Sequence, residues 1–166
     1  DLNLYKVWGR DSNDVFFVGE AGIIIHWDGE RFSRRDIPRS ELLFTVHGQS
    51  EGPLMAVGGL DGAVAFDETD MNWLDSEPPT VPGLNGVFVR EDAQTIATGN
   101  RGVILVRAAT KEWYTVRIEQ AAELGGRTLH AVWSGGTTWM VGGDLSTMSD
   151  GVILTDQTPI PTLEAE

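Results

Sequence analysis

The chain has 166 residues, with 12 basic and 25 acidic side chains, a formal net charge of −13 and no cysteine. This acidity excludes a surface that wraps nucleic acid or anionic lipid, because both require basic patches. The lack of cysteine excludes disulfides and thiolate metal sites. No apolar run approaches the roughly 20 residues that a membrane span needs, and the hydrophobic fraction of 41% is enough for a packed core.

The first forty residues predict four short strands, which we place at Leu4–Trp8, Val15–Val18, Ile23–Trp27 and Phe32–Arg35. Branched and aromatic side chains dominate these segments, as is usual in strands. Asp28-Gly29 between the last two is a strong hairpin signal. The pattern therefore predicts one antiparallel unit of four strands.

Three landmarks of this unit recur in the same order along the chain. The first landmark, a valine followed by a ring-bearing residue, is Val7-Trp8 and returns as Val46-His47, Val87-Phe88 and Val132-Trp133, at spacings of 39, 41 and 45 residues. A residue pair ending in glycine follows each copy, and then a glycine that leads an apolar run. The pairs are Val18-Gly19, Val57-Gly58, Thr98-Gly99 and Val141-Gly142, and the leading glycines are Gly22, Gly62, Gly102 and Gly151. We expect each pair's glycine to permit a tight turn or a close approach between units.

A four-stranded unit of about 40 residues in tandem is typical of a β-propeller blade. We expect an all-β fold of one propeller region, residues 1–166, with blades at about 1–39, 40–80, 81–122 and 123–166. Pro159 and Pro161 disfavour a fourth strand in the last blade, so we expect it to be incomplete and the chain to be part of a larger propeller. A closed four-bladed ring, a β-sandwich and a β-solenoid are the alternatives, and Glu119–Leu124 is the one segment that could form a helical turn.

The first unit also resembles a known family through its Leu4–Gly9, Asp14–Gly19 and Gly22–Gly29 segments. These are similar to propeller repeats of the photosystem II assembly-factor and sialidase-like (BNR) superfamily. Such repeats occur in large secreted or envelope proteins of bacteria, myxobacteria especially. The resemblance implies a propeller fold and a secreted or cell-envelope location, with the cytoplasm as the alternative. The Asp-box of true sialidases is missing from all four units.

The turns between the second and third strands of each unit are the candidate ligand face. In a propeller these turns lie together at one end of the axis. Glu20, Asp61, Arg101 and Asp144 occupy them here, and we predict that they form a ligand-binding face. The alternative is that they are ordinary polar turn residues.

Catalytic and metal motifs are missing from the sequence. His47 and His130 occupy packing positions of the first strands, so we expect neither to bind a metal, and the prediction is no metal site and no cofactor. The oxygen-rich segment Asp144–Asp150 keeps calcium as an alternative. The carboxylates follow no catalytic pattern, so the prediction is that the protein is not an enzyme.

These observations favour a non-catalytic binding or scaffolding propeller with a protein or carbohydrate partner. A fragment of a glycan-active enzyme and a lectin-like module are the alternatives. Residues 41–80 carry eight acidic side chains and no basic one, which indicates either a patch for a basic partner or a solubilising surface. Pairing with another propeller segment or self-association is expected if the end blades are left open.

Overall fold

The fold is taken from a computed structural model that describes residues 2–117, 124, 126–144, 146–147 and 149–157. The segment 119–123, where a helical turn was predicted, lies outside the described residues, as does the proline-containing segment 158–166. Among the described residues, no helix is long and apolar enough to cross a membrane.

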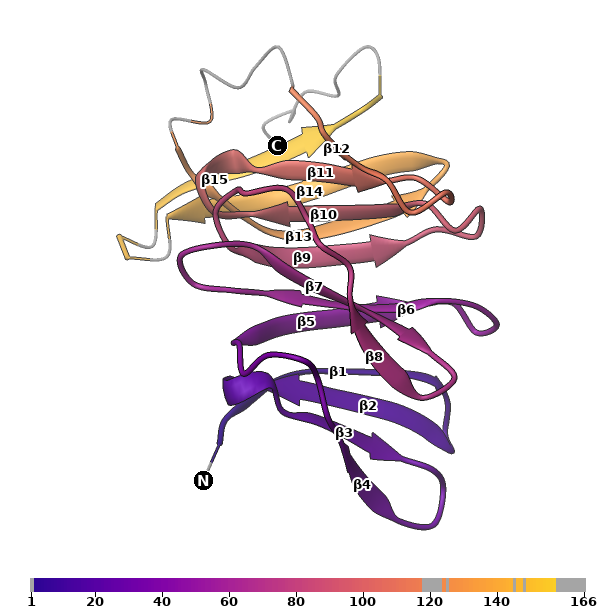
Figure 1. The fold of residues 1–166 in the computed structure, drawn as a ribbon. Coiled ribbons are helices and arrows are strands. Elements are labelled where there is room, and N and C mark those ends of the chain that lie inside the picture. Colours follow the sequence, from indigo (N-terminus) through magenta and orange to yellow (C-terminus); the bar gives the residue numbers. More distant parts are fainter. Residues whose placement is uncertain (1, 118–123, 125, 145, 148, 158–166) are drawn as a thin grey trace, which may run out of the picture.

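Four antiparallel sheets follow one another along the chain and stack in chain order (Figure 1). The first contains β1 (Leu4–Asp11), β2 (Asp14–Gly19), β3 (Ile24–Trp27) and β4 (Phe32–Arg35). The second contains β5 (Leu43–Gly48), β6 (Leu54–Gly58), β7 (Val64–Thr69) and β8 (Asn72–Asp75). The third contains β9 (Leu84–Val89), β10 (Thr95–Gly99), β11 (Ile104–Arg107) and β12 (Trp113–Thr115), and the fourth β13 (Thr128–Gly135), β14 (Thr137–Asp144) and β15 (Ser149–Thr155).

The all-β prediction with repeated antiparallel units is confirmed by this arrangement. Each sheet lies within one predicted repeat, and strands pair only with their neighbours in sequence. The fourth sheet has three strands among the described residues. The first and fourth sheets lie at opposite ends of the stack (Figure 1), so the described residues do not close into a ring.

One rule of orientation holds at every join between sheets. The first strands β1, β5, β9 and β13 pack beside one another in this order. At each of the three joins, the landmark valine of the later sheet packs against the earlier sheet, and the residue after the landmark valine of the earlier sheet faces the later one. Val46, Val87 and Val132 thus enter the three successive cores, whereas the rings of Trp8, His47, Phe88 and Trp133 each contact the next in the series, at centroid distances of 5.8, 4.4 and 6.4 Å.

Three separate hydrophobic cores result, one between each pair of consecutive sheets. Phe16 and Ile24 of the first sheet pack on Val46 and Phe66 of the second. Met55 and Val57 meet Val87 and Leu105 in the next core, and Ile96 and Ile104 meet Leu129 and Val132 in the last. The two middle sheets are therefore buried on both faces, whereas each end sheet is buried on one.

The repeated glycines at the ends of the second strands are explained by close approach within a sheet. A Cβ atom on Gly58 would lie 1.9 Å from the carbonyl oxygen of Leu42, which immediately precedes the adjacent strand. Gly19, Gly99 and Gly142 meet the backbone in the same way, at 2.0 to 2.2 Å. The approach is thus between neighbouring strands of one unit, and at this position it leaves no room for any side chain.

The acidic second unit finds basic partners in the neighbouring units. Asp67 of the second sheet forms a buried ion pair with Arg107 of the third sheet. Arg10 of the first sheet reaches Glu68 at 2.9 Å, and Arg39, which precedes the second sheet, reaches Asp75 at 2.7 Å. Three of the eight acidic side chains in this unit are therefore used in holding the stack together.

Candidate functional site

The turns that join the second and third strands all lie along one edge of the stack, which we call the turn edge (Figure 1). In the first and third sheets the turn is a short 3-10 segment, Glu20–Gly22 and Asn100–Gly102. Its middle residue, Ala21 or Arg101, has a left-handed φ of 52° or 57°, and the glycine after it has a φ of 69° or 71°. The two turns thus share one backbone conformation, although their side chains differ.

The predicted ligand-binding residues occupy these turns but do not converge on one point. Asp61 and Arg101 are exposed, and Glu20 and Asp144 are half-buried. Of the four, Asp144 lines a cavity at this edge, and the other three lie outside its lining.

Glu20 is held by residues of its own sheet. One carboxylate oxygen accepts the backbone N–H of Asn3 at 3.0 Å, and the other accepts the Asn3 amide at 2.9 Å and the Tyr5 hydroxyl at 3.0 Å. The hydrogen bonds from Asn3, followed by that from Tyr5, hold the pKa of Glu20 below its usual range. Glu20 therefore stays ionised and acts here as an acceptor for the start of β1.

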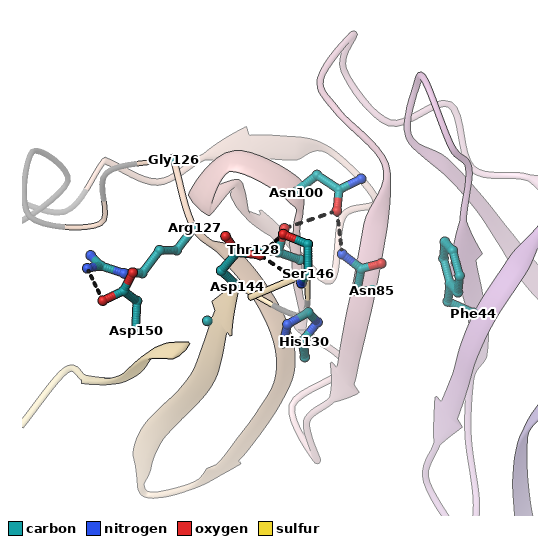
Figure 2. A pocket seen from close by; sticks show the side chains of 11 residues that line it. Phe44, Asn85, Asn100, Gly126, Arg127, Thr128, His130, Asp144, Ser146 and Asp150 are labelled. Atoms are coloured by element: carbon teal, nitrogen blue, oxygen red, sulfur yellow. Dashed lines mark hydrogen bonds and ion pairs between the residues drawn. The ribbon is translucent and has the colours of Figure 1, made fainter. Parts of the chain in front are cut away.

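The cavity has a volume of about 590 Å³ and lies at the turn edge between the second, third and fourth sheets (Figure 2). Its lining combines two amides, hydroxyl groups, two carboxylates and one guanidinium group. The residues are Phe44, Asn85, Asn100, Gly126, Arg127, Thr128, His130, Gly143, Asp144, Ser146 and Asp150.

Asn100 is the centre of the polar contacts in this cavity. Its side-chain oxygen accepts the Asn85 amide at 2.9 Å and the Thr128 hydroxyl at 3.5 Å. Because the oxygen accepts both bonds, the NH₂ group of Asn100 points away from these donors (Figure 2). The third and fourth sheets thereby fix the orientation of the Asn100 amide, which lines the cavity.

Two carboxylates lie on the fourth-sheet side. Asp144 accepts the Ser146 hydroxyl at 2.6 Å and its backbone N–H at 2.8 Å, and these bonds hold the pKa of Asp144 below its usual range. Asp150 lies 3.7 Å from the Arg127 guanidinium group. Within the described part of the chain, no group of three or more histidine, aspartate or glutamate side chains is placed to hold a metal ion.

A β-bulge brings three of the lining side chains to the cavity, and sequence reasoning did not predict it. The pairing register shifts by one residue near the start of the first strand in all four sheets. The residues at the bulge are Tyr5, Phe44, Asn85 and His130. Bulges redirect side chains at the edges of sheets, and here Phe44, Asn85 and His130 reach the cavity, while Tyr5 reaches Glu20. The signal in the sequence is a repeated Leu-x-x-Val spacing whose first x differs in every unit.

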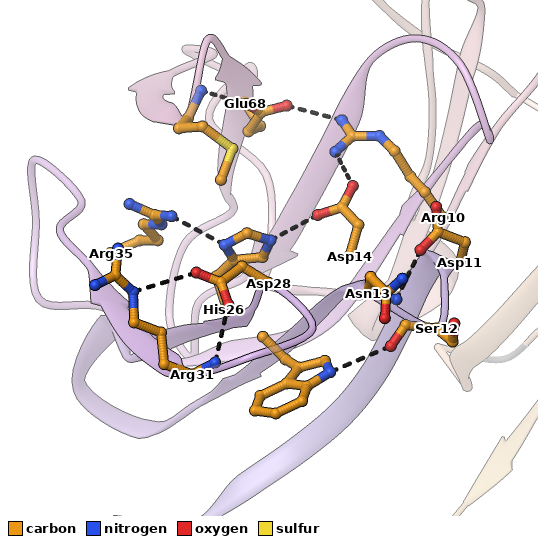
Figure 3. Close-up of polar contacts among 12 residues, drawn as sticks. Arg10, Asp11, Ser12, Asn13, Asp14, His26, Asp28, Arg31, Arg35 and Glu68 are labelled. Carbon is orange, nitrogen blue, oxygen red and sulfur yellow. Dashed lines mark hydrogen bonds and ion pairs between the residues drawn. The ribbon is translucent and has the colours of Figure 1, made fainter.

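A second polar cluster lies at the join between the first and second sheets (Figure 3). The His26 ring is buried, with Nε2 2.6 Å from Asp14 and Nδ1 2.9 Å from Arg35. Since arginine can only donate, Nδ1 is the acceptor and Nε2 carries the proton that it donates to Asp14. Arg10 bridges Asp14 to Glu68 of the second sheet.

This cluster is best described as a structural link. Partial burial alone would raise the pKa of Asp14, but the hydrogen bonds from Arg10 and His26 and the charge of Arg10 outweigh it and hold the pKa below its usual range. His26 also stacks on Phe16 at a centroid distance of 4.5 Å, within the first core. The five side chains thus form one connected series of polar contacts that runs from Arg35 to Glu68.

Neither protein-family models nor curated proteins match the chain. The resemblance to sialidase-like propeller repeats therefore stays a prediction, and the site is interpreted from its own geometry.

Proposed function

We propose that the protein is a non-catalytic binding module of the β-propeller type that takes a glycan in the cavity at the turn edge. The observation that carries the proposal is the oriented pair Asn85–Asn100 with Thr128, which lines a cavity of about 590 Å³ together with two carboxylates. Side-chain amides, hydroxyls and carboxylates complement the closely spaced hydroxyl groups of a sugar ring.

Three features support the propeller. The sheets are sequential antiparallel meanders, their first strands lie side by side, and every join uses the same pair of faces. Repetition of one join is what a radial arrangement of blades requires. Under this proposal the described sheets are four blades of a larger ring, and a secreted or cell-envelope location would expose the cavity to extracellular glycans.

Two observations favour binding over catalysis. A glycosidase needs a carboxylic acid that keeps its proton near neutral pH. Asp144 has the opposite property, because its hydrogen bonds with Ser146 lower its pKa. Burial raises the pKa of Asp67, but that carboxyl is paired with Arg107 between the second and third sheets and does not line the cavity.

The bulge residues explain how such a module would select its ligand. The same backbone position carries Phe44, Asn85 and His130 in successive sheets, so one framework presents an aromatic ring, an amide and an imidazole to a single cavity. An aromatic face and hydrogen-bonding groups together are well suited to the apolar face and the hydroxyls of a sugar.

The test is a glycan array followed by calorimetry with the best binder. We expect Asn100→Ala to weaken binding about 5- to 30-fold, because loss of one oriented hydrogen-bonding group costs about 1–2 kcal/mol. Asn72→Ala is the matched control, since Asn72 is an exposed asparagine at the start of β8 and does not line the cavity. Binding of a protein but of no glycan, or equal binding by both variants, would overturn the proposal.

A further inference from the structure

The two end sheets expose apolar faces that their counterparts in the middle of the stack bury. Val7 in the first sheet is 54% exposed, whereas Val46 at the same repeat position is fully buried. Ile153 in the fourth sheet is 59% exposed, whereas Ile104 at the same repeat position of the third sheet is buried. The sequence therefore repeats the core pattern at both ends, although within the described residues nothing covers these faces.

The outer face of the first sheet is lined by Val7, Val15, Phe17, Ile25, Trp27 and Phe32, which share one side of the sheet by strand register. Three of these form an aromatic group, with Phe32 lying 6.0 Å from Phe17 and 4.7 Å from Trp27 between ring centroids. Phe32 is 65% exposed. By the rule that holds inside the stack, this is the face that packs on a preceding sheet.

The outer face of the fourth sheet is lined by Ala131, Trp133, Trp139, Val141, Ile153 and Thr155. Trp133 is 54% exposed and ends the ring series that begins at Trp8. By the same rule, this is the face that packs on a following sheet. The two exposed faces are thus the two different halves of the join that the chain already makes three times.

We propose that the outer face of the fourth sheet binds the outer face of the first sheet of a second copy of this chain, head to tail. A second copy is the occupant because it supplies the missing half of each join in the orientation used inside the stack. The first and fourth sheets of one copy lie at opposite ends (Figure 1), so they do not meet each other. In this assembly Trp8 of the second copy continues the ring series beyond Trp133, and the contact is heterologous.

The experiment is light scattering of the full chain after size-exclusion chromatography, at concentrations in the tens of micromolar. We expect the wild-type mass to be at least twice the chain mass of 18.1 kDa. Val7→Lys and Ile153→Lys each place a charge in the apolar contact, so each variant alone is expected to run at the mass of one chain. Leu74→Lys is the matched control, because Leu74 is also 54% exposed but lies on β8 of the second sheet; it is expected to keep the wild-type mass.

A mixture of the two variants identifies the head-to-tail geometry. The first variant keeps an intact fourth-sheet face and the second an intact first-sheet face, so the mixture is expected to regain a two-chain species. A wild-type mass of one chain, or a mixture that stays at one chain, would overturn the proposal. Continued association of Ile153→Lys alone would also overturn it, because the first-sheet faces would then pair with each other. Phe32→Lys and Val141→Lys provide a second pair if circular dichroism shows that a first variant is unfolded.

Discussion

The two middle sheets and the two end sheets are built from the same repeat, yet they differ in what their side chains do. In the middle sheets both faces are apolar and buried, and charged side chains reach across the joins, as Arg107 does to Asp67. In the end sheets one face keeps the apolar pattern but is exposed. The difference shows that each repeat has two apolar faces. Its stability therefore depends on the neighbouring sheets that cover these faces, and not on the repeat alone.

The largest difference is expected at the ion pair between the middle sheets. Arg107→Ala leaves the Asp67 carboxylate buried without its partner, and we expect the free energy of unfolding to fall by about 3–5 kcal/mol in urea denaturation. Arg34→Ala is the control in an end sheet, because Arg34 lies 4.0 Å from Asp36 and both side chains are exposed. A loss below about 0.5 kcal/mol is expected there. Equal losses for the two variants would contradict the comparison.

A smaller difference is expected where only apolar burial is changed. Ile104→Ala removes a buried side chain of the third sheet, and we expect a loss of about 2–5 kcal/mol. Ile153→Ala, at the same repeat position in the fourth sheet, should cost less than about 1 kcal/mol in urea denaturation of dilute protein, because the side chain is already largely exposed. Similar losses at both positions would show that the fourth-sheet face is covered in the isolated chain.

The smallest effect concerns pH and the join at His47. Burial, followed by the charge of Lys6, lowers the pKa of His47 to about 4, and its Nδ1 accepts the backbone N–H of Val89 at 3.0 Å. Because the folded pKa lies below the ordinary value of 6.5, the unfolded chain binds the proton first as the pH falls. The free energy of unfolding should therefore decrease between pH 6.5 and pH 4, by about 1–2 kcal/mol after allowance for solvent screening.

The matched variant for this pH effect is His47→Asn, which keeps an acceptor near Nδ1 but does not titrate. It loses the stacking on Phe88, so it should be less stable at pH 7 while showing a flatter profile between pH 6.5 and pH 4. Parallel profiles for the two proteins in denaturation experiments would exclude His47 as the cause.

The strand pattern could be predicted because it depends on local chemistry. Glycines and the Asp28-Gly29 hairpin set the turns, and branched or aromatic residues set the strands, so the predicted strands of the first unit are found, with β1 extending to Asp11. The predicted position of the turns at one edge agrees with the fold (Figure 1). The role of Gly58 was predicted only in part, since its close neighbour is the backbone before β5 of the same sheet.

The candidate site was harder to predict because it depends on register and on packing between units. Asn85 and His130 reach the cavity through a bulge, and a bulge moves a side chain without any change in the apolar pattern. The pair of Asp67 and Arg107 joins residues 40 positions apart, so neither residue signals its partner. The sequence suggested that the acidic side chains of the second unit form a surface patch, whereas three of them are paired with arginines of the neighbouring units.

The pairing of the second unit with arginines on both sides has a consequence for rearranging the chain. Units that share a backbone can in principle be duplicated or exchanged, as in many repeat proteins. Here a second unit placed beside a copy of itself would bring acidic side chains together, because the unit contains no basic residue and its partners Arg10, Arg39 and Arg107 come from its neighbours. The charges of the units therefore favour this one order of units. Chains with the units in another order should fail to fold stably, although every unit keeps its strand-forming residues.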